Sequence, residues 1–95
     1  MRIVWSPTAM RHLAEIRRYV ARHNPQAAAR TAAAVRQAVA ALQDFPGIGR
    51  VGRVPSTREL VVTNTPYIVP YSVRSDSIEI HAVLHGARKW PEHFG

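Results

Sequence analysis

The sequence contains no cysteine, which excludes disulfide bonds and thiolate metal sites and fits a reducing, cytoplasmic environment. No apolar run approaches the roughly 20 residues that span a bilayer. The N-terminus also lacks the apolar stretch of a signal peptide, so we expect no association with a membrane. With 95 residues the chain has room for one hydrophobic core. We therefore predict a single domain over residues 1–95.

Acidic residues are scarce. Six Asp and Glu face 13 Lys and Arg, which gives a net charge of +7, and Lys89 is the only lysine. Residues 1–45 carry seven arginines against Glu15 and Asp44, so most of the excess lies in the N-terminal half. Such an imbalance indicates an acidic partner: nucleic acid, an acidic protein or an anionic surface. A solvated basic surface without a partner is the alternative.

The N-terminal half has the pattern of two amphipathic helices after a short strand at residues 3–5. Ser6-Pro7 and Asn24-Pro25 each place a capping side chain before a proline at the first helical position. Apolar residues of the first helix recur at helical spacing, at Ala9, Leu13, Ile16 and Val20. The connection between the helices is short, which predicts an antiparallel hairpin.

The C-terminal half reads as three antiparallel strands over residues 58–63, 66–74 and 77–85, which are rich in Val, Ile, Tyr and Thr. Side chains alternate along a strand. In the last run this alternation predicts one face with Ile78, Ile80, Ala82 and Leu84. It predicts the opposite face with Glu79, His81, Val83 and His85.

In the middle run, alternation assigns four residues to the helix-facing side: Tyr67, Val69, Tyr71 and Val73. Pro70 cannot donate a ladder hydrogen bond, so we expect either a bulge in this run or a nitrogen that faces away from a partner.

The preceding residues 45–55 hold three glycines and two prolines. They predict a turn-rich surface loop with Arg50 and Arg53 exposed.

The order strand, helix, helix, strand, strand, strand predicts an α+β two-layer sandwich. The N-terminal strand joins a mostly antiparallel sheet, and the helical hairpin packs on one face of it. We expect the opposite face and the end of the chain to be free to engage a target.

Several stretches resemble the RelE/ParE toxins of bacterial type II toxin–antitoxin modules. They are Ser6-Pro7, Asn24-Pro25, Phe45-Pro46-Gly47-Ile48-Gly49-Arg50, Thr57–Val62, Pro66–Val69 and Val83–Pro91. The resemblance implies a toxin held in a hetero-oligomer by a cognate antitoxin, whose C-terminal segment covers the helical hairpin and the sheet. The residues expected to contact this acidic segment are Arg11, Arg18, Arg22 and Arg74.

The family divides on activity. ParE-like members inhibit DNA gyrase, in modules that stabilise plasmids, whereas RelE-like members cleave messenger RNA on the ribosome. RNA cleavage would need groups that stabilise a phosphate and move protons. The candidates, which we term the nuclease set, are Arg58, Arg74, Glu79, His81, His85 and Arg88.

RelE-like nucleases commonly carry a tyrosine close to the C-terminus, whereas this tail offers Trp90 and Phe94. We therefore favour the ParE-like branch, with Arg88, Lys89 and Trp90 as target-binding residues, and leave open whether the protein is an enzyme. A third alternative is a nucleic-acid-binding module or an inactive toxin homologue. Few aromatic residues are predicted on the face that carries Glu79, His81 and His85, which disfavours nucleic-acid binding.

The individual residues also have simpler interpretations. Glu79, His81 and His85 form either an acid–base cluster or an interface surface. His81 and His85 would lie roughly 13 Å apart along a strand, too far for one metal ion, so we expect no metal or cofactor. Arg88 contacts either a partner or the carboxylates of Glu59 or Glu79. Trp90 either packs the tail onto the sheet or anchors a protein partner.

Overall fold

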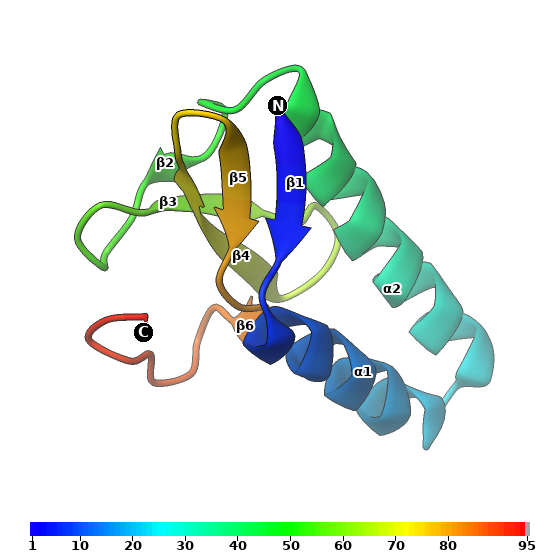
Figure 1. The fold of residues 1–95 in the computed structure, drawn as a ribbon. Helices are drawn as coiled ribbons and strands as arrows, with labels where there is room; N and C mark the ends of the chain where they lie inside the picture. Colours follow the sequence, from blue (N-terminus) through cyan, green and yellow to red (C-terminus); the bar gives the residue numbers. More distant parts are fainter. Residues whose placement is uncertain (95) are drawn as a thin grey trace.

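The computed structural model describes residues 1–94 and consists of two helices packed on a mixed sheet of six strands (Figure 1). The elements are β1 (Arg2–Trp5), α1 (Pro7–Ala21), α2 (Pro25–Ala40), the 3-10 turn η1 (Ala41–Gln43), β2 (Arg50–Val51), β3 (Arg58–Val61), β4 (Tyr67–Val73), β5 (Ser77–Ile80) and β6 (Leu84–His85). The strand order is β1-β5-β4-β3-β2, and β6 pairs with β4. Only the β1–β5 pair within these residues is parallel. The α+β sandwich predicted from the sequence is confirmed.

Both helices begin where the capping pattern predicts. The Ser6 hydroxyl accepts a hydrogen bond from the Ala9 N–H (3.0 Å), and the Asn24 carbonyl oxygen accepts one from the Ala27 N–H (3.1 Å). Ser6 also donates to the carbonyl of His81 (3.0 Å), which ties the start of α1 to the residue that follows β5. No helix within residues 1–94 is long and apolar enough to cross a membrane.

The core lies between the helices and one face of the sheet. Val35, Val39 and Leu42 pack here against the strands and are at most 1% exposed. Val69 and Tyr71 of β4 are fully buried in this core and Tyr67 is half-buried against it, as predicted. Val73, at the end of the strand, is 43% exposed, so its predicted place beneath the helices is wrong.

The last predicted strand is interrupted opposite Pro70. Tyr71 of β4 pairs with Ile80, whereas Tyr67 pairs with His85, so the segment facing β4 contains one residue more than β4 between these two pairs. The carbonyl of Pro70 accepts from the N–H of His81 (3.0 Å). The nitrogen and carbonyl of a strand residue point to the same neighbour, so the missing N–H of Pro70 lies opposite this irregularity. The bulge is therefore in the partner strand, and β4 itself is continuous.

One extra residue reverses the alternation beyond Ile80. Val83, predicted on the polar face, lies in the core at 3% exposure. His85 pairs with Tyr67 and lies on the helix-facing side, and Leu84 pairs with Ile68 on the opposite side. The predicted face shared by Glu79, His81 and His85 is therefore wrong for His85.

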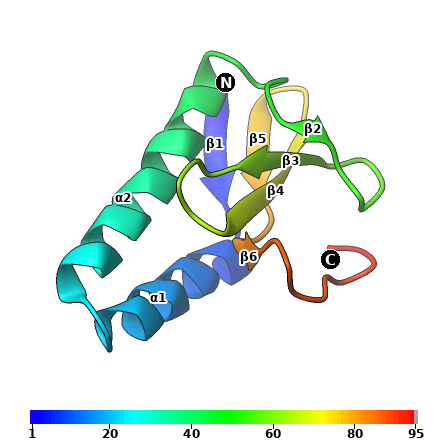
Figure 2. The same ribbon diagram turned by 180° about the vertical axis from the view of Figure 1, so that it is seen from behind.

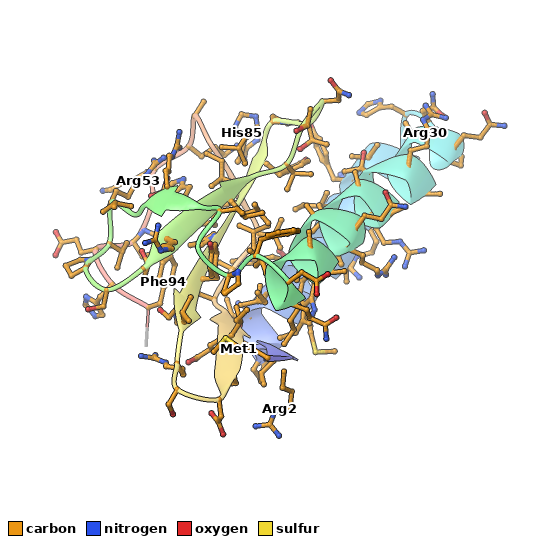
Figure 3. The ribbon with its side chains drawn as sticks, turned by 90° about the horizontal axis from the view of Figure 1, so that it is seen from above. Met1, Arg2, Arg30, Arg53, His85 and Phe94 are labelled. Carbon is orange, nitrogen blue, oxygen red and sulfur yellow. The ribbon has the colours of Figure 1, made fainter. Side chains whose placement is uncertain are left out.

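The chain after β6 leads away from the two helices (Figures 2 and 3) and contacts the sheet face opposite them, which we term the outer face. Trp90 lies beneath the guanidinium of Arg53, whose central carbon is 3.6 Å from the centre of the indole ring. Phe94 stacks on His81 with 5.1 Å between ring centres. The expectation that the outer face and the chain's end are both free is therefore wrong, because the tail covers part of this face.

Candidate functional site

A groove of about 490 Å³ lies between α1, the start of β4 and the segment around β6, and we term it the α1 groove. Three segments far apart in the sequence supply its polar side chains: His12, Glu15, Tyr19, Tyr67, His85, Arg88 and Lys89. The reversed alternation after Ile80 is what turns His85 toward α1. The α1 groove brings two predicted target-binding residues, Arg88 and Lys89, next to aromatic residues that the sequence did not single out.

The two histidines of the α1 groove have their Nδ1 atoms fixed by the backbone. His12 Nδ1 accepts from the N–H of Val83 (3.3 Å), and His85 Nδ1 accepts from the N–H of Ala87 (3.1 Å). In a neutral ring the proton is then on Nε2. Burial lowers the pKa of His12, the charge of Arg11 lowers it further, and Glu15 opposes both. His12 is therefore a neutral donor at physiological pH.

Tyr67 meets His85 edge to face, with 6.0 Å between ring centres. Burial raises the pKa of Tyr67, Tyr19 adds to the rise, and the nearby charge of Arg88 opposes it. The phenol consequently keeps its proton and can donate a hydrogen bond. It has no tendency to act as a base at neutral pH.

Arg88 and Lys89 are exposed and form no ion pair with any residue among 1–94. The carboxylates considered as alternatives for Arg88 are occupied: Glu59 binds two other arginines, and Glu79 binds Arg74 at 3.1 Å. The salt-bridge interpretation of Arg88 is therefore wrong. Its charge is available at the groove.

A second polar cluster lies on the outer face and contains Ser72, Arg74, Glu79 and His81. Ser72 donates to the carbonyl of Ser56 (3.0 Å), so the 2.7 Å contact of its oxygen with His81 Nε2 has the imidazole as donor. Burial lowers the pKa of His81, Glu79 opposes this and Arg74 adds to it. The Nδ1 atom lies 3.8 Å from the Glu79 carboxylate. Phe94 covers the ring, so this histidine is both neutral and shielded.

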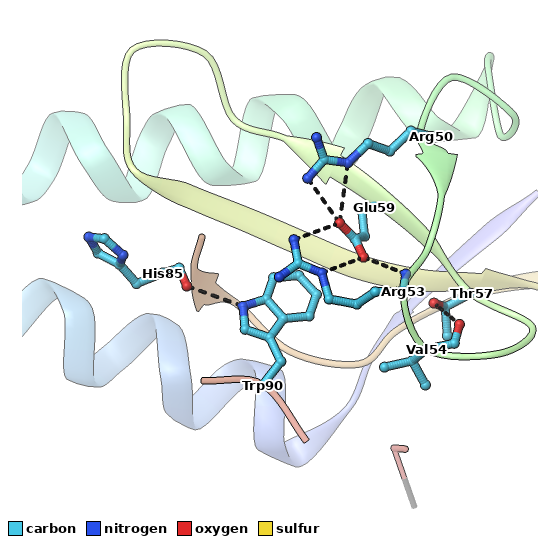
Figure 4. A network of polar contacts seen from close by, with 7 residues as sticks. All are labelled: Arg50, Arg53, Val54, Thr57, Glu59, His85 and Trp90. Carbon is cyan, nitrogen blue, oxygen red and sulfur yellow. Dashed lines mark hydrogen bonds and ion pairs between the residues drawn. The ribbon is translucent and has the colours of Figure 1, made fainter. Parts of the chain in front are cut away.

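Glu59 is the centre of the most extensive polar network, seen in Figure 4. Its side chain is 3% exposed and accepts from Arg50 through Nε (3.2 Å) and Nη2 (3.0 Å). Arg53 donates through its backbone N–H (2.7 Å), Nε (3.0 Å) and Nη2 (3.1 Å). Burial alone would raise the pKa of Glu59, but the hydrogen bonds and charge of Arg53, together with the hydrogen bonds of Arg50, lower it. The two arginines predicted to be merely exposed therefore hold a buried carboxylate.

Trp90 extends this network to the tail. Its indole N–H donates to the carbonyl of His85 (3.2 Å), and its ring packs against the guanidinium of Arg53. Of the two interpretations offered by the sequence, packing of the tail onto the protein is the one observed. Trp90 does not line the α1 groove with Arg88 and Lys89.

The nuclease set does not converge on one place. His85 and Arg88 lie at the α1 groove, on the helix-facing side of the sheet. Arg74, Glu79 and His81 lie in the outer-face cluster. Arg58 is directed elsewhere and donates to the carbonyls of Gly47 (3.4 Å) and Gly49 (2.7 Å). The structure thus divides these residues among three locations.

Three of the four residues predicted to contact an antitoxin lie along α1. Arg11 is paired with Glu15 at 3.7 Å, Arg18 lines a hollow between the two helices, and Arg22 follows the last residue of α1. Arg74 lies apart from them, in the outer-face cluster.

Within residues 1–94, no group of three histidine or acidic side chains is placed to hold a metal ion.

His12, Tyr19 and Tyr67 were missed as site residues. One signal was present, because positions 12, 15, 16 and 19 follow helical spacing and mark one side of α1. The sequence does not indicate that this side faces Tyr67 and His85, because that depends on the bulge.

Comparison with known proteins agrees with this architecture. Residues 3–90 match the family model described as "ParE toxin of type II toxin-antitoxin system, parDE". The chain is 46% identical over 91 residues to "Putative toxin Y4kP" of Sinorhizobium fredii, covering 96% of this chain and 94% of that protein. It is 35% identical over 86 residues to "Toxin RelE2" of Caulobacter vibrioides, covering 90% and 96%.

Among solved structures, the chain resembles one described as "Chromosomal ParDE TA system from P. aeruginosa". The TM-score is 0.81 at 27% identity, over 90% of this chain and 95% of that chain. The family model covers nearly all of the sequence, and the sheet and helices have a counterpart in a toxin–antitoxin structure. The chain belongs to the ParE toxin family of type II toxin–antitoxin systems.

Proposed function

We propose that this toxin acts in the bacterial cytoplasm by binding and inhibiting DNA gyrase, without catalysing a reaction itself. The observation that carries the proposal is the separation of the nuclease set into three locations, with the ring of His81 covered by Phe94. A ribonuclease needs its phosphate-binding and proton-transferring groups within reach of one phosphate. A binding toxin needs only an accessible charged surface, and exposed Arg88 and Lys89 supply one.

Messenger cleavage on the ribosome is the second candidate. It is favoured by the two histidines that line the α1 groove together with Arg88, and by a relative named RelE2 at 35% identity. It requires that His12 and His85 transfer protons at the ribosome. Only His85 belongs to the nuclease set, and most of that set lies outside the α1 groove. The two candidates differ in target, so one comparison separates them.

The test is a gyrase supercoiling and DNA-cleavage assay alongside cell-free translation. We expect the full chain to block supercoiling and accumulate cleaved DNA while translation proceeds. Replacing both Arg88 and Lys89 with alanine should raise the toxin concentration needed by about tenfold, as truncation of charged interface anchors does. Arg30→Ala, which removes a charge from exposed α2 surface, is the control. Cut messenger RNA with unaffected gyrase would overturn the proposal.

We propose further that a cognate antitoxin neutralises the toxin in a hetero-oligomer, in a module that stabilises a plasmid or chromosomal segment. The cationic side of α1, which carries Arg11, Arg18 and Arg22, supports an acidic antitoxin segment. Long-range attraction of this kind accelerates encounter more than it slows dissociation.

Replacing Arg11, Arg18 and Arg22 together with glutamine should therefore slow association with the antitoxin by about tenfold at low salt. Surface plasmon resonance measures this, and the dissociation rate should change far less. Arg74→Gln serves as a comparison from the outer face. An association rate that is unchanged in the triple variant would remove α1 from the antitoxin surface.

A further inference from the structure

We propose that the α1 groove binds one unpaired nucleotide of a single-stranded nucleic acid, with its phosphate near Arg88 and Lys89 and its base against Tyr19 and Tyr67. This inference goes beyond gyrase inhibition, and its test involves no gyrase. It rests on the side chains that the fold gathers from α1, β4 and the segment around β6.

The size of the groove fits this ligand. Its volume of about 490 Å³ lies within the range of pockets that hold small ligands, on the order of 300–1,000 Å³. A nucleotide fills such a space, whereas a stacked and paired duplex presents no free base to enter it. The groove is therefore suited to a single strand.

The charge of the groove is complementary to a phosphate. Arg88 and Lys89 have no acidic partner among residues 1–94, so neither must give up an ion pair when an anion binds. Glu15 is the one carboxylate that lines the groove, and Arg11 lies 3.7 Å from it. The net charge at the groove is thus positive without counting the histidines.

The aromatic residues supply the surface that a base needs. Tyr19 is 53% exposed and meets His23 only edge to face, at 6.0 Å between ring centres. Tyr67 also lines the groove, in edge-to-face contact with His85. Bases stack on such rings regardless of sequence. The scarcity of aromatics argued against nucleic-acid binding, but the fold collects two of the three tyrosines in one groove.

The neutral polar groups distinguish a nucleotide from an acidic peptide. A peptide rich in carboxylates would use the cations but has no need for uncharged donors beside aromatic rings. Tyr67 retains its hydroxyl proton, and the Nδ1 atoms of His12 and His85 are occupied by backbone N–H groups. Tyr67 and His12 therefore supply uncharged donors beside the cationic end, which match a base with polar edges joined to a phosphate.

Fluorescence anisotropy of the full chain tests this with labelled single strands of about eight nucleotides, one of deoxythymidine and one of uridine. We expect both to bind, since the groove is assigned no contact that requires a 2′-hydroxyl, and a preference for one would identify the natural source. Tyr19→Ala should weaken binding on the order of tenfold. Arg88→Gln should reduce the steepness of the salt dependence, between about 50 and about 200 mM, by about one ion.

Two controls separate the groove from general attraction to a basic protein. Arg30→Gln removes the same charge from exposed α2, and Phe45→Ala removes a ring that is 61% exposed outside the groove. Both should leave binding within about twofold of the parent protein. If Arg30→Gln equals Arg88→Gln, or Phe45→Ala equals Tyr19→Ala, the inference is overturned.

A glutamate-rich peptide of matching net charge tests the other class of ligand. Equal competition by this peptide, with the same loss in Tyr19→Ala, would show a peptide groove and refute the proposal. If the protein inhibits gyrase but binds no single strand, this inference is refuted and the proposed function is retained.

Discussion

Replacing Glu59 with alanine is expected to lower the free energy of unfolding by about 3 kcal/mol, because it leaves two arginines without their shared carboxylate. Glu59 accepts five hydrogen bonds at 3% exposure. Removing one partner of a buried ion pair costs about 3–5 kcal/mol. The side chains of Arg50 and Arg53 are 55% and 42% exposed, so water can compensate them in part. This places the expected loss at the low end.

Urea-induced unfolding at neutral pH measures the loss, and Glu79→Ala is the matched control. Glu79 is 40% exposed and pairs with Arg74, whose side chain is 53% exposed. Such a surface pair contributes about 0–1 kcal/mol. Equal destabilisation by the two substitutions would mean that the buried network has no special role.

The same carboxylate predicts a dependence on pH. The pKa of Glu59 is lowered in the folded protein from its ordinary value of 4.5. A lowered folded pKa means that the contribution to stability is complete above the unfolded value and is lost as pH falls through the folded value. The parent protein should therefore lose stability below about pH 4.5 more steeply than Glu59→Gln, which lacks this titration.

Gly49→Ala is expected to destabilise the protein by about 3 kcal/mol, because there is no space for a methyl group at this position. An added Cβ would lie 2.6 Å from the hydroxyl oxygen of Tyr71 and 2.9 Å from the carbonyl oxygen of Glu59. Tyr71 is fully buried, and its hydroxyl accepts from the N–H of Gly49 (2.9 Å) and donates to the carbonyl of Pro46 (2.7 Å). Tyr71 cannot move away without breaking these bonds, and the carbonyl of Glu59 belongs to β3, which is paired on both sides.

Gly47→Ala provides the control two residues away. Nothing lies within 4 Å of a Cβ at Gly47, so that variant should unfold within about 0.5 kcal/mol of the parent protein. Thermal and urea unfolding of both variants measure the difference. Equally mild effects would show that the loop relaxes around the added methyl group, and that the packing of Tyr71 against it does not restrain position 49.

Local signals were sufficient to predict the helices. Ser6-Pro7 and Asn24-Pro25 combine a side-chain cap with a proline whose missing N–H is not needed, so both starts depend only on neighbouring residues. The apolar face of α1 and α2 follows from spacing in the same way. The α+β class then follows from the order of the elements.

Contacts between distant residues could not be predicted in this way. Arg50 and Arg53 were predicted only to be exposed, and Glu59 was considered as a partner of Arg88, because nothing in a single sequence indicates which carboxylate is buried. Burial of Glu59 depends on β2 pairing with β3 and on loop residues returning to the same side chain. The crossing of the tail over the outer face depends likewise on Trp90 meeting Arg53.

The α1 groove was predicted only in part, for a related reason. Arg88 and Lys89 were singled out as exposed charges, but His85 was assigned to the wrong face because strict alternation was extended past Ile80. Pro70 gave a warning that the ladder is disturbed. It did not reveal which of the two facing strands carries the extra residue.

The irregularity beside Pro70 makes the length of residues 81–83 more consequential than their composition. Shortening this connector by one residue would keep every neighbouring amino acid and yet exchange the two sides of β6. His85 would then point away from α1, and the tail would leave the sheet from the wrong surface. The number of residues that face Pro70 thereby decides on which side of the sheet His85 lies.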